Sequence, residues 1–261
     1  MSGEKVGQKR RCTAVILAGG SGSRMHSNVA KQFMMLGGKP LLWYSLQAVQ
    51  QSEIIDDCIL VAGRTEDSAG GSWSDTLEYV RREIVEKYGF TKVDAIIPGG
   101  SERCWSVENA MAVLRDGAEY ARVPNRDGYI FIHDSARPFL TEEILRRTYE
   151  TVQQYHACVA AMPSKDTVKL ADEDGFAAST PPRSRVWTIQ TPQVFDTALI
   201  TKVYGRLREQ YLQSAQAPVT DDASVVELFS DVSVKLVEGS YQNIKITTPE
   251  DIKIAEAFLE F

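Results

Sequence analysis

A glycine-rich turn directly follows an apolar run near the start of the chain, in AVILAGGSGSRM. Its glycines, Gly19, Gly20 and Gly22, leave backbone N–H groups open to a polyanion, because no side chain stands in the way and positive φ angles are freely adopted. Arg24 and Lys31 follow, and two cations after such a backbone nest can neutralise a triphosphate. The pattern indicates phosphate binding, and the alternative is a tight turn followed by two solvated charges.

The spacing of these glycines differs from two well-known phosphate loops. No GKS or GKT follows them, as a P-loop requires, and the third glycine of the dinucleotide-binding pattern is not at its place. A dehydrogenase would also need an acidic residue closing the next strand, which the sequence does not supply cleanly. A dehydrogenase is therefore a weaker interpretation.

Two acidic motifs offer further chemistry. Asp134 and Arg137, in HDSARP, follow an apolar run where a predicted buried strand ends, and ligands bind at that edge of an open α/β sheet. Asp134 also suits a helix N-cap or a salt bridge with Arg137. The adjacent Asp221 and Asp222, in VTDDAS, suggest a metal pair, but adjacent carboxylates point in different directions, and the helical pattern that follows favours capping of a helix N-terminus.

The elements that must position these residues alternate along the chain. Segments typical of buried strands are CTAVILA, CILVAG, VDAIIPGG, GYIFIHD, ACVAAMP and VSVKLVEG. Helical patterns lie between several of them, at residues 40–51, 73–88, 106–115 and 142–155. The alternation predicts an α/β fold that is Rossmann-like, with a mainly parallel twisted sheet and helices on both faces.

This alternation breaks over residues 164–190, which have turn residues, a Pro-Pro pair and no helical period. We expect residues 167–170 and 186–189 to pair antiparallel around the DEDG turn, forming a protruding β-arm that needs a partner surface. Residues 1–261 are expected to form a single domain, with residues 1–11 as a disordered tail. The loop at residues 64–75 is expected to be a surface insertion.

Composition and charge exclude several classes of protein. With 261 residues and 43% hydrophobic residues, the chain can bury a core without disulfides or metals. A net charge of -6 and the lack of a basic stripe argue against a nucleic-acid partner. Four dispersed cysteines and three histidines form no recognisable metal set, and we assign His133 no proton-transfer role. No apolar run suits a signal peptide or a membrane span, so we expect a cytoplasmic protein with no membrane contact.

Nine motifs occur in an order that resembles one enzyme family: LAGGSGSRM, KQF, GGKPLLWYSL, PGGSERCWSV, IHDSARPF, PSKDTVK, IQTPQVF, VTDDASVVE and NIKITTPEDI. The chain resembles the 2-C-methyl-D-erythritol 4-phosphate cytidylyltransferases of the non-mevalonate isoprenoid pathway. The resemblance implies transfer of CMP from CTP to the polyol phosphate, with release of pyrophosphate. Such a transfer needs positioning and charge neutralisation by cations, backbone donors and Mg²⁺, rather than covalent catalysis.

The resemblance also implies roles for individual residues. Arg24 and Lys31 match the family's transition-state stabilisers. The positions that match its CTP-binding residues are Leu17, Ala18, Gly19, Gly20, Ser21, Gly22, Ser23, Gly100, Ser101, Ser106 and Lys245. Residues 17–23 correspond to its triphosphate loop, and Gly100, Ser101 and Ser106 to the stretch that meets the cytosine.

An acceptor site, a metal and a second subunit follow from the same resemblance. The positions that match substrate-binding residues are Asp134, Arg137, Thr167, Arg183 and Lys245. Asp134 is the candidate ligand for Mg²⁺, alongside phosphates and water. Arg183 is chosen over Arg185 because Trp187 and the following QTPQ set the register. In the family the arm clasps a second subunit and completes its active site, so a homodimer is implied.

Two positions depart from the family's pattern. Pro182 stands where several members have Asp, and Ser101 stands where many have Asp or Glu, which bears on the arm and on one contact near the cytosine or ribose. The main alternative is a ribitol-5-phosphate cytidylyltransferase, against which the SRVW and VTDDASVVE segments weigh. A second alternative is a non-catalytic nucleotide-binding subunit, against which the intact charged positions weigh.

Overall fold

The computed structural model describes residues 9–19, 30–63, 73–116, 127–211 and 219–260. The strands are β1 (Cys12–Ala18), β2 (Met35–Leu36), β3 (Lys39–Pro40), β4 (Asp57–Ala62), β5 (Val93–Pro98), β6 (Tyr129–Asp134), β7 (Ala157–Pro163), β8 (Leu170–Ala171), β9 (Ala177–Ser179), β10 (Trp187–Asp196) and β11 (Lys235–Glu238). The α-helices are α1 (Leu41–Gln51), α2 (Trp73–Tyr79), α3 (Arg103–Asp116), α4 (Glu142–Tyr155), α5 (Thr197–Tyr211), α6 (Asp222–Phe229) and α7 (Pro249–Leu259). Two 3₁₀ turns, η2 (Lys31–Phe33) and η4 (Arg183–Arg185), and a π-helical continuation of α2, η3 (Val80–Glu86), complete the set.

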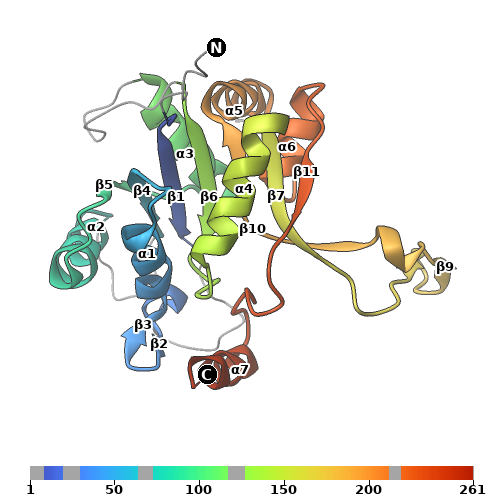
Figure 1. Ribbon diagram of the computed structural model, residues 1–261, viewed down its shortest axis with the longest axis horizontal. Coiled ribbons are helices and arrows are strands. Elements are labelled where there is room, and N and C mark those ends of the chain that lie inside the picture. Colours follow the sequence, from blue (N-terminus) through green and yellow to red (C-terminus); the bar gives the residue numbers. More distant parts are fainter. Residues whose placement is uncertain (1–8, 20–29, 64–72, 117–126, 212–218, 261) are drawn as a thin grey trace, which may run out of the picture.

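Seven of these strands form the central sheet, in the order β11-β7-β10-β6-β1-β4-β5 (Figure 1). β1 pairs in parallel with both β4 and β6, whereas β10 runs antiparallel to β6 and β7. The chain builds the sheet outward from β1 through β4 to β5, and then returns to place β6 on the other side of β1. In open α/β sheets ligands bind at the carboxyl ends of the strands beside such a reversal.

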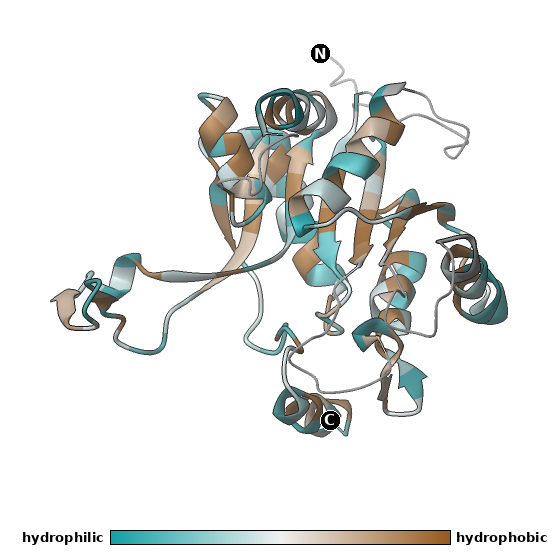
Figure 2. Cartoon of the chain, turned by 180° about the vertical axis from the view of Figure 1, so that it is seen from behind, coloured by the Kyte–Doolittle hydropathy of each residue, from teal (hydrophilic) through white to brown (hydrophobic). Residues whose placement is uncertain are grey.

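Different helices cover the two faces of this sheet. Every residue of β1 and of β6 is buried, as parallel strands covered on both faces require. One core cluster joins the sheet to α1, η3 and α4, and the other joins it to α3, α5 and α6. Figure 2 shows the mostly hydrophobic strands of the sheet between these helices. The predicted α/β fold, with a mainly parallel sheet and helices on both faces, is confirmed.

Each of the six segments predicted as buried strands contains a strand of this sheet, and helices occupy the four predicted helical regions. Strand β10 was not expected in the sheet, because its sequence WTIQTPQVFD breaks the apolar pattern with polar residues. Among the described residues, no helix combines the length and the apolar character needed to cross a bilayer. The loop at residues 64–75 lies mostly outside the described residues, as does most of the N-terminal tail.

Residues 164–186, which we call the projecting segment, leave the sheet between β7 and β10 and extend away from it (Figure 1). At its base, the Ser164 N–H donates to the Val186 carbonyl at 2.8 Å, and residues 187–189 pair with β7. At its tip, β8 pairs antiparallel with β9 around Gly175, whose φ is 86°. The expected pairing of residues 167–170 with 186–189 is therefore wrong, because residues 186–189 continue the existing ladder between β10 and β7.

Candidate active site

The carboxyl ends of four parallel strands meet at one edge of the sheet. Gly19 follows β1, Gly63 follows β4, Gly99 follows β5, and β6 ends in Asp134. The two central strands are in register there, with Leu17 of β1 opposite Asp134 of β6. The predicted phosphate loop and the predicted metal ligand therefore begin from neighbouring strands.

Glycine is required at this edge because the turns pack against each other. A Cβ on Gly63 would lie 2.6 Å from the Gly19 Cα, which is closer than such atoms approach. A Cβ on Gly19 would lie 3.7 Å from the Ser106 Oγ, so the phosphate turn and the predicted cytosine stretch are neighbours. The remainder of the predicted phosphate loop lies outside the described residues: Gly20, Ser21, Gly22, Ser23 and Arg24.

Ser106 ties the first turn of α3 to the turn that follows β5. Its Oγ accepts the Gly100 N–H at 3.0 Å and donates to the Glu102 carbonyl at 3.1 Å. Gly100 has no room for a side chain, since a Cβ would lie 2.4 Å from the Trp105 Cβ. Ser106 is buried, whereas Ser101 is exposed. Ser106 thus fixes the backbone of a turn whose outer side is open to solvent.

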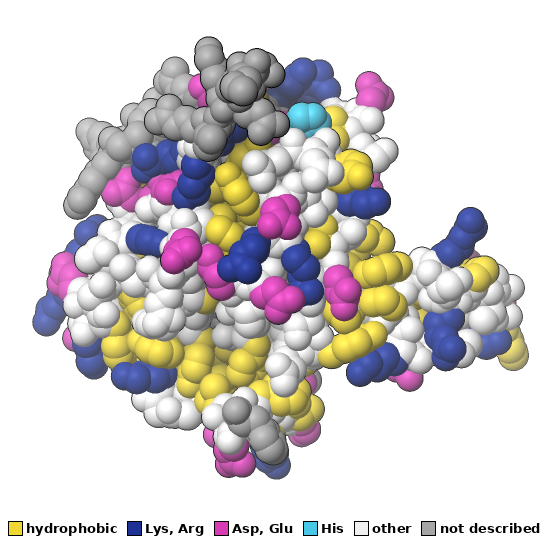
Figure 3. Space-filling view, viewed as in Figure 1, with side chains coloured by type: hydrophobic (Ala, Val, Ile, Leu, Met, Phe, Trp, Pro, Cys, Tyr) yellow, Lys and Arg dark blue, Asp and Glu magenta, His cyan; other side chains and the backbone are white. Residues whose placement is uncertain are grey.

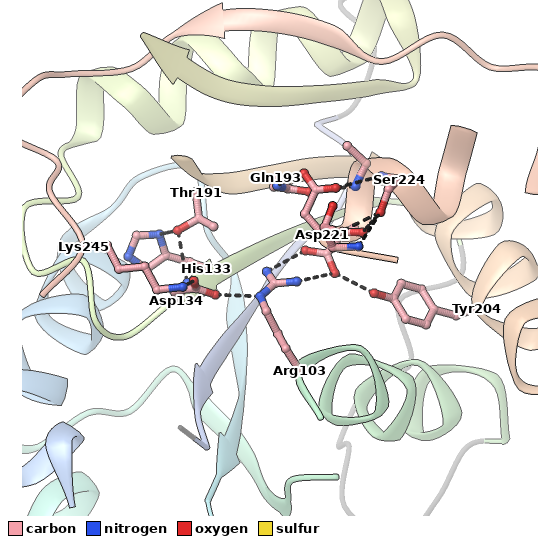
Figure 4. Close-up of polar contacts among 12 residues, drawn as sticks. Arg103, His133, Asp134, Thr191, Gln193, Tyr204, Asp221, Ser224 and Lys245 are labelled. Atoms are coloured by element: carbon pink, nitrogen blue, oxygen red, sulfur yellow. Dashed lines mark hydrogen bonds and ion pairs between the residues drawn. The ribbon is translucent and has the colours of Figure 1, made fainter. Parts of the chain in front are cut away.

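Asp134 holds two cations on its carboxylate (Figure 4). Its Oδ1 accepts from the Arg103 Nε at 3.0 Å, and its Oδ2 accepts from the Lys245 Nζ at 2.7 Å. The Asp134 backbone N–H donates to the Thr191 Oγ1 at 3.1 Å. Burial alone would raise the pKa of Asp134, but Arg103 and Lys245 lower this pKa well below its usual range. Asp134 is therefore an ionised carboxylate at neutral pH.

Arg137 directs its guanidinium to backbone carbonyls. It donates to the Asn243 carbonyl at 2.7 Å and to the Ile189 carbonyl at 3.2 Å. The alternative of a salt bridge between Asp134 and Arg137 is therefore wrong, because the Arg137 guanidinium binds these carbonyls and Asp134 pairs with Arg103 and Lys245 instead. Arg137 instead joins β10 to the segment that carries Lys245.

His133 is buried beside Asp134 and supports the same turn. Its Nδ1 lies 2.9 Å from the Thr191 Oγ1, and its Nε2 lies 3.0 Å from the Arg137 carbonyl. Thr191 accepts the Asp134 N–H, so its hydroxyl hydrogen is free to go to Nδ1, which leaves the ring proton on Nε2. Burial lowers the pKa of His133 to about 4, so the ring is neutral at physiological pH.

Arg103 makes a second ion pair, with Asp222 at the start of α6. Its two terminal nitrogens donate to the two carboxylate oxygens at 2.9 and 2.7 Å, and the Tyr204 hydroxyl donates to Asp222 Oδ1 at 2.6 Å. The adjacent Asp221 caps α6 by accepting the Ser224 N–H at 2.9 Å. The prediction of helix capping is confirmed for Asp221, whereas Asp222 is a fully buried ion-pair partner.

A model of one protein family, IspD: 2-C-methyl-D-erythritol 4-phosphate cytidylyltransferase, matches residues 12–261. The chain belongs to this family. A 2-C-methyl-D-erythritol 4-phosphate cytidylyltransferase of Lachnospira eligens is 46% identical over 248 residues, which cover 95% of this chain and 99% of that protein. A relative of the same name from Lachnoclostridium phytofermentans is 40% identical over 249 residues, with coverage of 95% and 96%.

Solved structures of IspD proteins share the fold. The 4-diphosphocytidyl-2C-methyl-D-erythritol synthase of Anaerococcus prevotii superposes with a TM-score of 0.76 at 35% identity, covering 97% of each chain. The 2-C-methyl-D-erythritol 4-phosphate cytidylyltransferase of Francisella tularensis gives a TM-score of 0.71 at 26% identity, covering 95% of this chain and 99% of that one. These likenesses do not favour the ribitol-phosphate enzyme or the non-catalytic subunit.

The site residues implied by the IspD motifs fall in different places. Those along the sheet edge or bonded to it are Leu17, Ala18, Gly19, Gly100, Ser101, Ser106, Asp134, Arg137 and Lys245. Lys31 begins the short turn η2 and is partly buried. Thr167 and Arg183 are exposed on the projecting segment, which extends away from this edge in the single chain.

Arg103 and Asp222 were missed as site residues. Both lie inside IspD motifs, in PGGSERCWSV and VTDDASVVE, but they are 119 positions apart in the chain. Their pairing depends on how α3 and α6 pack against the sheet, and no local spacing encodes it. The only signal in the sequence was the presence of both charges within motifs of the family.

Proposed function

We propose that this protein transfers CMP from CTP to 2-C-methyl-D-erythritol 4-phosphate. A phosphate oxygen of the acceptor attacks the α-phosphorus of CTP, the bond from that phosphorus to the bridging oxygen of the β-phosphate breaks, and pyrophosphate leaves. The products are 4-diphosphocytidyl-2-C-methyl-D-erythritol and pyrophosphate. The observation that carries the proposal is the match of residues 12–261 to the IspD family. The reaction joins two anions, and the Lys245 ammonium at the sheet edge can help to neutralise them.

The triphosphate side of the site consists of backbone donors and cations. Residues 17–23 hold the phosphates through N–H groups, and Arg24 and Lys31 stabilise the charge that develops as pyrophosphate leaves. Lys245 is oriented by Asp134 at 2.7 Å, while its side chain stays 39% exposed. The Lys245 ammonium has three donors, so it can hold Asp134 and still donate to a substrate phosphate.

The cytosine is read by the turn between β5 and α3. Gly100 and Ser101 offer backbone groups, and Ser106 offers a hydroxyl oxygen, for the amino and carbonyl edges of the base. The hydrogen bond from the Gly100 N–H to Ser106 holds this turn in place before the nucleotide arrives. A prepositioned turn favours selective binding, because less ordering is needed when the base enters.

Mg²⁺ fits the donor set of the site. This ion is commonly held by one or two carboxylates together with substrate phosphates and water. Within the described residues, no three His, Cys, Asp or Glu side chains gather into a site of their own. Asp134 supplies one ionised carboxylate, each of whose oxygens has lone-pair capacity beyond its hydrogen bond to a cation. When bound, Mg²⁺ would neutralise phosphate charge, and Asp134 is the residue that would hold it.

We further propose that the protein works as a homodimer in which the projecting segment completes the partner's acceptor site. Thr167 and Arg183 would bind the acceptor phosphate there. The segment carries exposed cations, including Lys165, Lys169, Arg183 and Arg185, and Figure 3 shows basic side chains along it. Leu170 and Phe176 are 55% and 72% exposed at its tip. Apolar side chains and very short strands of this kind gain stability against another surface.

The remaining proposals concern organisation and location. Residues 1–261 are one nucleotidyltransferase domain, and the arm that extends from it is the projecting segment, residues 164–186 of the expected 164–190. The protein acts in the cytoplasm and has small-molecule substrates, with no nucleic-acid or membrane partner.

The test is to identify the product by mass spectrometry. The purified protein is incubated with CTP, Mg²⁺ and either 2-C-methyl-D-erythritol 4-phosphate or ribitol 5-phosphate, with a chelator control. The expected result is a CDP-linked methylerythritol and an equal amount of pyrophosphate, lost on removal of the metal. Pyrophosphate without a CDP-linked product, or faster turnover of ribitol phosphate, would overturn the proposal.

A further inference from the structure

We infer that Asp222 and Arg103 act as a positioning pair that orients Asp134 and keeps its carboxylate open to a ligand. The inference rests on the proposed function. It gives a role to two motifs, VTDDASVVE and IQTPQVF, that contain none of the proposed substrate contacts. It follows from the direction in which the Arg103 guanidinium points.

The guanidinium of Arg103 divides its donors unequally. Its two terminal nitrogens bind both oxygens of Asp222, and the Nε alone donates to Asp134 at 3.0 Å. A guanidinium whose two terminal nitrogens have no other partner commonly binds a carboxylate through two parallel hydrogen bonds. Without Asp222, the terminal nitrogens of Arg103 would be free to bind both oxygens of Asp134. Arg103 would then compete with Lys245 for the Asp134 carboxylate. Asp222 therefore limits Arg103 to a single contact with Asp134.

The charges of this four-residue cluster balance. Asp134 and Asp222 face Arg103 and Lys245, so two carboxylates meet two cations (Figure 4). The side chain of Asp222 is 0% exposed, whereas that of Lys245 is 39% exposed. The cluster thus runs from a fully buried carboxylate that sets geometry, Asp222, to a reachable ammonium that can meet substrate, Lys245, while the side chains of Arg103 and Asp134 between them are 28% and 11% exposed.

One strand fixes the backbone on both sides of the cluster. Thr191 and Gln193 lie two residues apart on β10, and both side chains are buried. Thr191 Oγ1 accepts the Asp134 N–H at 3.1 Å, and Gln193 Oε1 accepts the Ala223 N–H at 2.8 Å. Gln193 also donates to Asp221 Oδ2 at 2.9 Å. The QTPQ sequence of β10 therefore sets the gap between β6 and α6 that Arg103 spans.

Tyr204 supports Asp222, the buried end of the cluster. Its hydroxyl donates to Asp222 Oδ1 at 2.6 Å, and its side chain, on α5, is fully buried in the core. Burial and the adjacent Asp222 raise the pKa of Tyr204 well above its usual range, so the hydroxyl stays a donor. Asp222 is therefore held by Arg103 on one side and by Tyr204 on the other.

The test compares Asp222→Asn with Asp221→Asn. Both variants remove one negative charge at the start of α6, but only Asp222 touches Arg103. Asp222→Asn is expected to lower kcat about tenfold to a hundredfold, as loss of a group that orients a ligand typically does, and to raise the Mg²⁺ concentration needed for half-maximal rate. Asp221→Asn keeps an oxygen that can cap α6, because Asn caps helices as well as Asp does, and it loses the hydrogen bond from Gln193, so Tm is expected to fall slightly while kcat stays close to that of the wild type. Equal kcat and equal Mg²⁺ dependence in the two variants would overturn the inference.

Two further variants keep the test decisive if Asp222→Asn folds poorly. Arg103→Lys keeps the charge but replaces the fork by one ammonium, which cannot span both carboxylates, and it is expected to show the same fall in kcat and the same shift in Mg²⁺ dependence. Tyr204→Phe removes a single hydrogen bond to Asp222 and is expected to show a smaller shift in the same direction. Wild-type kcat in a folded Arg103→Lys protein would overturn the inference. A wild-type protein that makes no CDP-linked product would instead overturn the proposed function.

Discussion

The sheet-edge cluster of Asp134, Arg103, Lys245 and Asp222 differs from the projecting segment in how its polar side chains are satisfied. In the cluster, each charged group has an opposite charge within 3.0 Å, and Asp222 is completely buried. In the segment, the strands are two and three residues long, and most side chains are exposed. Folding of one chain is therefore enough to preorganise the first region, whereas we propose that the second is completed by the surface of a second subunit. Substitutions in the cluster should affect stability and turnover together, and substitutions in the segment should affect turnover alone.

The largest effect is expected for Asp134→Asn. Loss of this carboxylate leaves Arg103 and Lys245 with one fewer counter-charge at a buried site, which should lower the free energy of unfolding by about 3 kcal/mol. The loss of a preorganised ligand should also lower kcat/KM by about a hundredfold or more. Urea unfolding and steady-state kinetics on the same preparation measure both.

Glu83→Gln is the matched control for charge removal, because Glu83 forms a surface pair with Lys87 at 3.3 Å. It is expected to change the free energy of unfolding by less than about 0.5 kcal/mol and to leave kcat/KM unchanged. If Asp134→Asn were as stable as this control, the cluster would not be preorganised in the way its geometry indicates.

A smaller effect, confined to the KM for the acceptor, is expected for Arg183→Gln. A lost charge-assisted hydrogen bond to the acceptor phosphate should raise the KM for the polyol phosphate about tenfold to a hundredfold, corresponding to about 1.5–3 kcal/mol. Tm should stay at the wild-type value because the side chain is exposed. Arg185→Gln, two residues along the same turn η4, is the control and should leave KM unchanged. The opposite outcome for the two arginines would assign the acceptor contact to Arg185.

The last effect concerns stability alone and is confined to acidic solution. Burial lowers the pKa of His133 from 6.5 to about 4. Between these two pH values, the imidazole of His133 is therefore protonated in the unfolded chain and neutral in the native state. The wild type should therefore lose about 3 kcal/mol of unfolding free energy from this group as the pH falls from 6.5 to 4, with no contribution to the slope outside that range. His133→Gln should flatten this slope, whereas Arg183→Gln in the projecting segment should leave it unchanged. Equilibrium unfolding at a series of pH values measures the slope.

Much of the sheet could be predicted because the sequences of its strands are apolar enough to be recognised. Segments such as CTAVILA and GYIFIHD are apolar on both faces, which parallel strands buried under helices require. β10 was not predicted as a strand of the sheet because Thr191 and Gln193 interrupt its apolar run. These two polar side chains accept hydrogen bonds from the backbone of Asp134 and from the start of α6. The pairing within the projecting segment was wrong for a related reason: residues 187–189 extend the ladder with β7 instead of folding back on the segment.

The candidate site could be predicted where its residues occur in recognisable motifs. Asp134 and Lys245 were named from their motifs, and they are in contact at 2.7 Å. Arg103 could not be paired with Asp222 in advance, because a contact across 119 residues depends on the packing of α3 and α6. The capping role of Asp221 was readable from local sequence, since a cap needs only the next three residues.

Mixing two inactive variants tests most directly whether the sheet-edge cluster and the projecting segment of different chains form one active site. Lys31→Ala removes a cation from the body of the protein, and Arg183→Gln removes one from the segment, so each homodimer should have about a tenth of the wild-type activity or less when the polyol phosphate is well below its KM. After the two proteins are unfolded and refolded together in equal amounts, activity should recover to about a quarter of the wild-type value, because half of the dimers are mixed and each mixed dimer has one intact site. No recovery, with mixed dimers present by mass spectrometry, would contradict this account and place both contacts of each active site within a single chain.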